Sequence, residues 1–524
     1  MSLSSSNVWA ASADALDAWF DRNWRTYLIL ASILCVATFV GYSHAKAPWN
    51  DEVLQMHIER QGSIGQVWDA VRGGTVQVDP PLLHVLGHIL IRTFGDHVLA
   101  VRAASIFGYL LMCVSFSILL KRHLPAIYAA AGFFLPYATI LRSRVPDARP
   151  YAMMIGFSAF ALLCWDSMND EDAPPKQRNR WRLGLGLSIA AMVSTHFFSV
   201  FFFAGLGLAE LVKWYVRKRI DWITILIVAL GTTPILIWIP TFLISRKIYM
   251  KHYFFPVKFE NFYNFYSFAL HTLPLMGALL LVVLVLALMP RIDRPASTEL
   301  TPRFRFLLAA AAGFLLVPAA GYILGLAVTG IFVNYYHIIA TFGLIVGLPL
   351  AVAALGGSNR TAGMALFLAI FGHGLFVTAR GLSGYLRTDQ TYPSIADMRK
   401  LIPNETNPDI VIPSPLHFLP LQEANRFDPL NSILYLYDPV RGLAALGTDT
   451  ADLCIYHVKP FTNARIEPFD AWTKTHSSFY IASLGETAGV QERQFAYFQR
   501  NPNARLPWLG QINGFRLYRA QLGP

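Results

Sequence analysis

Charged side chains are scarce in this chain: Asp, Glu, Lys and Arg make up only 14% of its 524 residues. A soluble domain carries roughly 25% charged residues, so the composition excludes a wholly soluble protein. Hydrophobic residues make up 54% of the chain, and many of them fall in long apolar runs. A run of about 20 residues crosses a hydrocarbon core ~30 Å thick. The composition therefore predicts a polytopic membrane protein with some soluble mass.

Cysteine is also scarce, and the sequence lacks several motifs that would indicate other functions. The four cysteines are too scattered for a disulfide framework or a zinc site; they are Cys35, Cys113, Cys164 and Cys454. The chain contains no internal repeat, no low-complexity tract and no GxxxxGKS/T phosphate-binding pattern. The absence of that pattern argues against nucleotide-driven transport.

The net charge of +11 reflects membrane topology more than affinity for nucleic acid. Most Lys and Arg residues fall in short clusters between hydrophobic runs, which is the pattern that the positive-inside rule produces. Applied along the chain, the rule places the N-terminus inside and the residues from 380 onward outside. Ser43 to Ala47 resembles a signal-peptidase site, but the preceding region is long and Pro48 would follow the cut, which favours an uncleaved first span.

About eleven membrane spans are expected from the apolar runs. Residues 183–212 are ambiguous, since one long helix would leave the basic residues 213–219 outside. Two short spans that meet near residues 194–196 would place those residues inside, as the positive-inside rule favours. The expected spans are 26–44, 99–120, 124–141, 151–165, two within 183–212, 222–244, 268–289, 306–328, 335–355 and 362–379.

Two regions lie outside these spans. Residues 48–97 contain amphipathic segments, typical of helices that lie along a membrane surface, at 52–60, 64–72 and 82–94. From residue 381 onward, short apolar runs between turn residues predict strands, and residues 487–500 predict a helix with Thr487 as its N-cap. The strands are expected at 409–412, 433–437, 453–457, 478–481 and 515–518. The fold class is therefore a mainly α, polytopic membrane bundle over residues 1–380 with a small α/β extracytoplasmic domain over residues 381–524.

Asp51 and Glu52 directly follow the first span, at the expected outer interface. A carboxylate there can take the proton from an acceptor hydroxyl as that hydroxyl attacks a sugar carbon. It could also help to hold a divalent cation through its oxygens. The alternative is that Asp51 only caps the amphipathic helix that follows it.

Arginines concentrate in the loop before residue 151, where the positive-inside rule does not explain them. Arg142, Arg144 and Arg149 suit a phosphate, because the guanidinium group binds phosphate in a bidentate way. A surface cluster that binds anionic lipid is the alternative. Asp147 is expected to cap the next span, with Pro150 in its first turn, and a second role as a metal or sugar ligand is compatible with that. The two loops predict a site at the outer mouth of the bundle.

Other residues at the same expected level are weaker candidates. Arg102, just inside the second span, could face the same phosphate or extend to the interface. His84 and His196 could bind substrate, although a lone histidine is more often structural. Tyr335 and His337 begin a span at this level, where an aromatic belt would explain the tyrosine equally well.

Four strings fall in an order that resembles a known superfamily. They are Asp51-Glu52, Asp79-Pro80-Pro81-Leu82-Leu83-His84, Val101-Arg102-Ala103-Ala104-Ser105 and Ala148-Arg149-Pro150-Tyr151-Ala152. Together they resemble the polytopic GT-C glycosyltransferases, in the branch that includes bacterial lipopolysaccharide sugar transferases, aminoarabinose transferases and protein O-mannosyltransferases. The similarity is clearest over residues 48–165. Family members more often have His or Lys before Pro-Pro-Leu, so Asp79 is a weak candidate for substrate binding.

The resemblance implies an inverting transfer of a sugar from a polyprenyl-phosphate donor at the outer face of a bacterial inner membrane. The acceptor would be a glycolipid, a polysaccharide or a protein. By the same resemblance Asp51 is the base, and Asp147 helps to position a cation or the acceptor. A transporter or flippase for an anionic lipid-linked sugar is the alternative, since it would use the same arginines. A transporter should show repeated halves with interrupted helices, and the sequence shows none.

Overall fold

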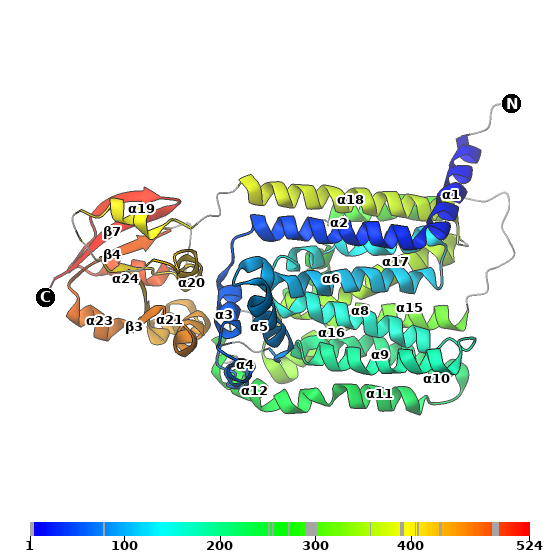
Figure 1. Cartoon of the computed structure of the whole chain (residues 1–524), viewed down its shortest axis with the longest axis horizontal. Helices are drawn as coiled ribbons and strands as arrows, with labels where there is room; N and C mark the ends of the chain where they lie inside the picture. Colours follow the sequence, from blue (N-terminus) through cyan, green and yellow to red (C-terminus); the bar gives the residue numbers. More distant parts are fainter. Residues whose placement is uncertain are drawn as a thin grey trace. The chain divides into compact units, whose positions relative to one another are not determined.

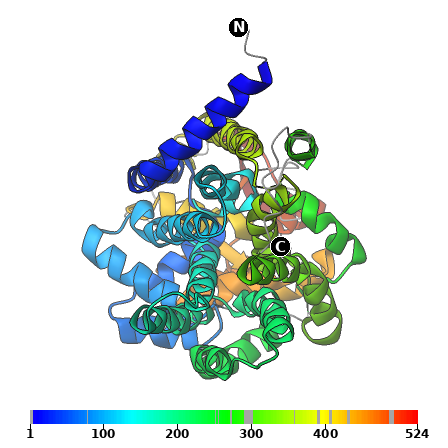
Figure 2. The same cartoon turned by 90° about the vertical axis from the view of Figure 1, so that its right-hand side faces the viewer.

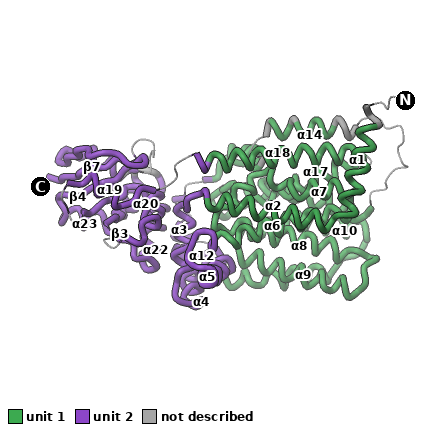
Figure 3. The backbone as a smooth tube through the Cα atoms, turned by 45° about the horizontal axis from the view of Figure 1, so that its top comes forward, with its two compact units in different colours: residues 1–44, 102–239, 257–384 green, residues 45–101, 240–256, 385–524 purple. Residues whose placement is uncertain are grey.

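The computed structural model describes most of the chain as two compact units (Figure 3). Unit 1 comprises residues 1–44, 102–239 and 257–384, and unit 2 comprises residues 45–101, 240–256 and 385–524. The described residues are 5–76, 79–249, 252–253, 256–270, 273–288, 301–356, 358–387, 392–403, 405, 408–428, 432–484 and 492–523. The single boundary expected after residue 380 stays a prediction, because unit 2 combines the C-terminal region with two earlier segments.

Unit 1 is a bundle of helices, several of which run side by side (Figures 1 and 2). Its helices, four of which (α2, α6, α12 and α18) extend into unit 2, are α1 (Ser5–Arg22), α2 (Trp24–Ala45), α6 (Val98–Lys121), α7 (Ala126–Phe134), α8 (Pro150–Met168), α9 (Pro175–Val193), α10 (Phe202–Arg217), α11 (Trp222–Thr232), α12 (Pro234–Tyr249), α13 (Phe259–Leu270), α14 (Leu273–Leu288), α15 (Pro302–Leu315), α16 (Val317–Leu324), α17 (Thr341–Gly356) and α18 (Arg360–Arg387). Short helices complete it: η1 (Leu135–Ala138), η2 (Ile140–Arg144), η3 (Phe197–Phe201), η5 (Gly325–Thr329) and η6 (Asn334–Ala340).

Each of the eleven expected spans contains helix, but not all are long single helices. Within the described part of the chain, 7 helices are long and apolar enough to cross a membrane, or 8 if the pair α11 and α12, bent by 44°, is one span. The other expected spans correspond to the short α7, to α9, which begins with basic residues, and to α13 with α14. Residues 183–212 do not form one long helix, since α9 ends at Val193 and η3 begins at Phe197; that they cross the membrane as two short spans stays a prediction.

Two glycines let α6 and α8 pack backbone against backbone. A Cβ atom at Gly108 would lie 2.4 Å from the Ala152 carbonyl oxygen, and one at Gly156 would lie 2.2 Å from that of Gly108. Small residues permit such close approach of membrane helices. Arg102 and Arg149 precede these glycines by six and seven residues, which is about 9 to 11 Å along a helix axis. The crossing therefore places both arginines at the same end of the bundle.

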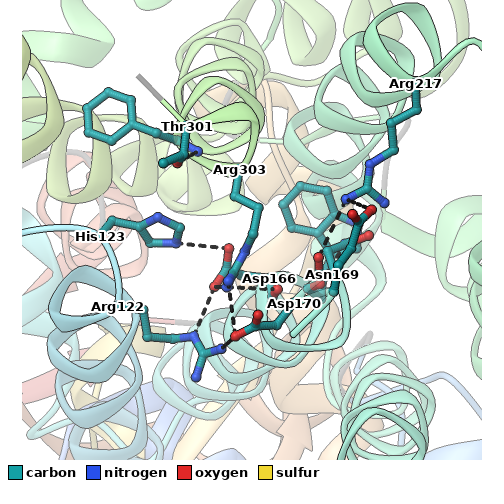
Figure 4. Close-up of polar contacts among 11 residues, drawn as sticks. Arg122, His123, Asp166, Asn169, Asp170, Arg217, Thr301 and Arg303 are labelled. Carbon is teal, nitrogen blue, oxygen red and sulfur yellow. Dashed lines mark hydrogen bonds and ion pairs between the residues drawn. The ribbon is translucent and has the colours of Figure 1, made fainter. Parts of the chain in front are cut away.

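Asp166 joins three helices at the opposite ends of α6 and α8 (Figure 4). Its carboxylate accepts hydrogen bonds from Arg122 Nε at 3.2 Å and from Arg303 Nη2 at 2.7 Å. His123 Nε2 lies 2.9 Å from the same carboxylate. Because Asp166 is buried on α8 and its partners follow α6 or begin α15, this network fixes the helices at that end.

Unit 2 combines helices from the first loop with a seven-stranded sheet from the C-terminal region. The helices are α3 (Asn50–Glu59), α4 (Ile64–Arg72), α5 (Leu82–Phe94), α19 (Ile395–Lys400), α20 (Pro415–Ala424), α21 (Pro439–Leu446), α22 (Thr450–Val458), α23 (Phe469–Thr475) and α24 (Arg493–Arg500). The strands are β1 (Ile410–Val411), β2 (Ile433–Tyr437), β3 (Arg465–Pro468), β4 (Ser478–Ser483), β5 (Ala504–Arg505), β6 (Trp508–Ile512) and β7 (Phe515–Leu522).

The sheet is mixed, with the order β3-β2-β1-β4-β7-β5 and with β6 paired to β7. Strands β1 to β4 are parallel, and β5 to β7 extend the sheet in antiparallel pairing. Helices connect the parallel strands, as an α/β arrangement requires. Apolar side chains of the central strands form its core with Trp472, Phe495 and Phe498; the strand residues are Val411, Leu434, Leu436, Phe479 and Ile481.

The helices and strands of unit 2 can be compared directly with those predicted from the sequence. The predicted amphipathic helices 64–72 and 82–94 are confirmed, as is the strand 433–437. The strand predicted at 453–457 is wrong, because these residues lie within α22. A five-residue apolar run does not distinguish a strand from one turn of a buried helix. Thr487 lies outside the described residues, and the helix there is described from Arg493.

Candidate functional site

Two of the candidate arginines hold helix ends together in unit 1. Arg102 is fully buried and donates from Nη1 to the Ser43 carbonyl at 2.8 Å, which joins α6 to the end of α2. Arg142 is also buried, and its Nη1 donates to the Val377 carbonyl of α18 at 3.1 Å and to Tyr42 Oη at 3.3 Å. Both guanidinium groups therefore have a structural role, whatever else they bind.

Arg144 and Arg149 are more accessible, because both are only partly buried. Arg144 Nη1 lies 3.5 Å from Asp147 Oδ2, and its guanidinium carbon lies 4.1 Å from the ring centroid of Tyr335. The guanidinium carbon of Arg149 lies 5.8 Å from the ring centroid of Tyr151. A cation over an aromatic face is stabilised by the ring quadrupole. The two side chains are thus placed by aromatic groups of α8 and η6.

The backbone between η2 and α8 is fixed by α6. Ser105 Oγ donates to the Asp147 carbonyl at 2.7 Å and lies 3.3 Å from the Arg149 carbonyl. Helix α8 begins at Pro150, as expected, since proline is tolerated in a first helical turn. The N-cap residue is Arg149, so the prediction that Asp147 caps this helix is wrong. The carboxylate of Asp147 is instead buried and faces Arg144.

His196 lies beside these residues, between α9 and η3. Its Nδ1 accepts a hydrogen bond from the Phe198 amide at 3.1 Å, so it caps η3. Its ring centroid is 5.3 Å from that of Tyr151 and 5.6 Å from that of Tyr336. Burial, helped by the positive charge of Arg149, lowers the pKa of His196 to about 3. The ring is therefore neutral near neutral pH, and it serves as a packing and capping group.

His337 packs in an apolar environment formed by Phe332 and the backbone near Gly321. Its ring stacks on Phe332 at 4.3 Å, and its Nδ1 lies 2.9 Å from the Val333 carbonyl. A Cβ atom at position 321 would lie 1.9 Å from His337 Nε2, so Gly321 leaves the space that this ring fills. These contacts explain the burial of His337 without a ligand.

Asp51 and Glu52 lie in the first turn of α3, in unit 2, and differ in their surroundings. Glu52 is fully buried, and its Oε2 accepts a hydrogen bond from the Trp49 amide at 3.2 Å. This is how a glutamate at the third helical position satisfies the N-cap amide. Asp51 is partly exposed. Glu52 therefore satisfies the N-cap amide of α3, and both roles considered for Asp51, base and structural group, stay predictions.

His84 belongs to a buried polar seam between α3 and α5 that the sequence did not reveal. Its Nδ1 lies 3.9 Å from Glu59 Oε1, and both side chains are fully buried. Gln55 Nε2 donates to Glu59 Oε1 at 2.7 Å. Burial raises the pKa of the Glu59 carboxyl well above its ordinary value. Asp79, also buried, directly precedes the two prolines before α5.

The structure thus groups the candidate residues within each unit. Unit 1 brings together Arg144, Asp147, Arg149, His196 and Tyr335. Unit 2 contains the two acidic residues of α3, together with Asp79 and His84. A cavity shared by the two sets stays a prediction. Within the described ranges, no group of three or more His, Cys, Asp or Glu side chains could hold a metal ion, and cation binding by Asp51 or Asp147 also stays a prediction.

Comparison with known proteins identifies the fold. No protein-family model matches the chain, and no curated protein sequence matches it. ArnT from Cupriavidus metallidurans in the apo state is similar in structure, with a TM-score of 0.59 at 14% sequence identity over 95% of this chain and 98% of that one. ArnT from the same organism bound to undecaprenyl phosphate gives a TM-score of 0.56 at 13% identity, with the same coverage. The expected polytopic, GT-C-like fold is therefore confirmed.

Proposed function

We propose that this chain is an inverting glycosyltransferase that moves a sugar from a polyprenyl-phosphate donor to an acceptor on the outer side of a bacterial inner membrane. The acceptor class is a glycolipid, a polysaccharide or a protein. The observation that carries the proposal is the pair of partly buried arginines, Arg144 and Arg149, at one end of a bundle with the ArnT fold. One of the similar ArnT structures is bound to undecaprenyl phosphate, which supports a lipid-phosphate ligand here.

Arg144 and Arg149 would bind the donor phosphate. Both guanidinium groups are held against aromatic rings, at 4.1 and 5.8 Å from the centroids, so little reorganisation is needed when an anion binds. Charge-assisted hydrogen bonds from arginine to phosphate are among the stronger ones in proteins. The leaving group of the reaction is the lipid phosphate, and fixed positive charge stabilises the negative charge that develops on it. Arg102 and Arg142 would support this site by fixing the helix ends.

Asp51 would act as the general base. In one displacement the acceptor oxygen forms a bond to the anomeric carbon, and the bond from that carbon to the phosphate oxygen breaks. The acceptor hydroxyl proton passes to the Asp51 carboxylate and then to water, and the lipid phosphate leaves with the bonding electron pair. Attack from the face opposite the leaving group inverts the anomeric carbon. Asp51 suits this role better than Glu52, whose carboxylate is buried and caps α3.

Replacement of Asp51 with asparagine tests the proposal and separates an enzyme from a carrier. The purified protein is incubated with labelled polyprenyl-phosphate sugars and a panel of acceptors, with and without chelator. For Asp51→Asn we expect transfer to fall by about 10²- to 10⁴-fold, the usual contribution of a general base, while donor binding is retained. A carrier without chemistry would not lose function in this variant.

Asp69→Asn is the matched control, because Asp69 is an exposed aspartate on α4 of the same unit. We expect this variant to transfer sugar at the wild-type rate. Unchanged turnover of Asp51→Asn would remove Asp51 as the base. A wild-type protein that translocates the lipid-linked sugar but transfers it to no acceptor would overturn the glycosyltransferase proposal in favour of a flippase.

A further inference from the structure

Four charged side chains form a closed ring in unit 2. Arg60 directly follows α3 and makes a bidentate pair with Glu423 of α20, with both nitrogen-oxygen distances at 2.6 Å. Glu423 also lies 3.3 Å from Arg426. Arg426 Nη1 donates to Asp96 Oδ2 at 2.8 Å, and Asp96 Oδ1 accepts from Arg60 Nε at 3.0 Å. The charges alternate around the ring, so every neighbouring pair attracts.

The ring joins parts of the chain that are far apart in sequence. Arg60 and Asp96 belong to the first loop, next to α3 and α5, whereas Glu423 and Arg426 belong to the C-terminal α/β region. An isolated surface ion pair contributes little. Here the Arg60 and Glu423 side chains are only 17% and 8% exposed, and a bidentate geometry adds strength and direction. The ring therefore holds the end of α3 against α20, and it contributes more than an exposed surface ion pair would.

A second contact supports the same joint. Gln61 Nε2 lies 3.4 Å from the Phe461 carbonyl, and His57 Nε2 lies 3.5 Å from Thr462 Oγ1. The two contacts connect the last turn of α3 and the residues directly after it with the segment between α22 and β3. Two segments of the C-terminal region therefore contact the same end of α3: α20, and the residues between α22 and β3.

The other end of α3 carries Asp51. The helix has ten residues and is about 15 Å long, and its backbone hydrogen bonds make it rigid over that length. A rotation of its last turn therefore moves its first turn. A misplacement of about 1 Å at a reacting group can reduce a rate by roughly 100-fold.

We propose that Arg60 is a positioning residue, through which the C-terminal α/β region sets the orientation of α3 and so of the Asp51 carboxylate. This inference rests on the proposed function, since it assigns Asp51 the role of base. It gives the C-terminal region a positioning role for the base without placing a catalytic residue in that region.

Reversal of the charge on Arg60 tests the inference in the full-length protein. For Arg60→Glu we expect kcat to fall by about 10- to 100-fold, as a misplaced base would produce, with the donor KM within about twofold of wild type. Amide exchange of α3 should accelerate in parallel. Arg519→Glu is the matched control, because Arg519 is more than a third exposed and contacts Glu405 at 3.9 Å and Ser478 Oγ at 3.4 Å, neither of which lies on α3 or α20; it should change neither quantity.

Inversion of the whole ring provides a rescue. The quadruple variant Arg60→Glu, Asp96→Arg, Glu423→Arg, Arg426→Glu restores alternating charges, and we expect it to recover most of the lost kcat and the slow exchange of α3. If Arg60→Glu does not fold, Glu423→Gln replaces it, because that change removes the charge and keeps the size. Wild-type kcat and exchange in the folded variant would overturn the inference.

The two readouts also separate this inference from the proposed function. If the wild-type protein transfers no sugar, the proposed function fails, and amide exchange still reports whether the ring holds α3. If transfer is observed and the folded ring variant loses protection in α3 without any loss of kcat, the coupling to Asp51 is wrong while the glycosyltransferase proposal stands.

Discussion

At the scale of single residues, neighbouring arginines of one loop have different surroundings and hence different roles. Arg142 is buried and bonded to a tyrosine hydroxyl and a backbone carbonyl, so it joins α18 to the rest of unit 1. Arg144, two residues later, is partly exposed over the ring of Tyr335. A sequence pattern identifies such a cluster by its charge. Which member faces a ligand depends on the turn of η2, which spacing alone does not give.

His57 provides a test at this scale. Burial, helped by the charge of Arg60, lowers the pKa of His57 to about 3 from an ordinary value of 6.5. Between these values the unfolded chain binds a proton that the folded protein excludes, so folding stability rises with pH across this window. Each pKa unit corresponds to about 1.4 kcal/mol. We therefore expect the wild-type Tm to drop between pH 7.5 and pH 5 and the drop to be smaller in His57→Gln.

Thermal unfolding of the purified protein at several pH values measures this difference. The neighbouring Glu59 has the opposite effect on the pH dependence of stability. Its pKa is raised in the folded protein, so above the ordinary pKa of a glutamate the folded state retains a proton that the unfolded chain has lost, and folding stability falls as pH rises. For that reason the comparison of His57→Gln with wild type, rather than the slope of either alone, reports on His57. Parallel pH profiles for the two proteins would show that His57 titrates normally.

At the scale of elements, sequence periodicity was informative where a helix has one apolar face. The amphipathic helices α4 and α5 begin and end where the pattern predicted. Residues 453–457 lie in α22 rather than in the expected strand, because their apolar run is too short to show a period. The seam between α3 and α5 was not foreseen, because Glu59 and His84 are 25 residues apart and their pairing depends on tertiary packing.

Packing of α3 on α5 depends on the absence of a side chain at Gly87. A Cβ atom there would lie 2.2 Å from the carboxyl carbon of Glu59, a fully buried side chain that accepts a hydrogen bond from Gln55. Overpacking of this kind costs about 1 to 3 kcal/mol. We therefore expect Gly87→Ala to destabilise unit 2, as measured by amide exchange of α3 and α5.

A second substitution makes this expectation specific to the Glu59 contact. Glu59→Ala removes the carboxyl group that the new methyl group would meet, so the double variant with Gly87→Ala should be less destabilised than the sum of the two single changes. Gly65→Ala is the control, because Gly65 lies on α4 with no contact closer than 3.8 Å at its Cβ position. Additive effects in the double variant would show that the clash is not with Glu59.

At the scale of the whole molecule, the chain divides the candidate machinery between its two units. Unit 1 has a polar network at each end of α6 and α8: one around Asp166 (Figure 4), and one around the arginines near Pro150. The first has its charges satisfied by one another, whereas the second leaves Arg144 and Arg149 partly exposed. The composition predicted the membrane bundle and the α/β region. The division of residues between units required the fold, since segments 45–101 and 385–524 are separated by most of the chain.

The most direct test of the central claim is the affinity of the purified protein for undecaprenyl phosphate. The double variant Arg144→Ala, Arg149→Ala is compared with wild type and with Arg180→Ala, an exposed arginine of α9. A hydrogen bond to a charged group contributes about 1.5 to 3 kcal/mol, so we expect Kd to rise at least about 10-fold in the double variant and to stay unchanged in Arg180→Ala. Equal affinity of all three proteins would contradict the claim that these two arginines hold the lipid phosphate.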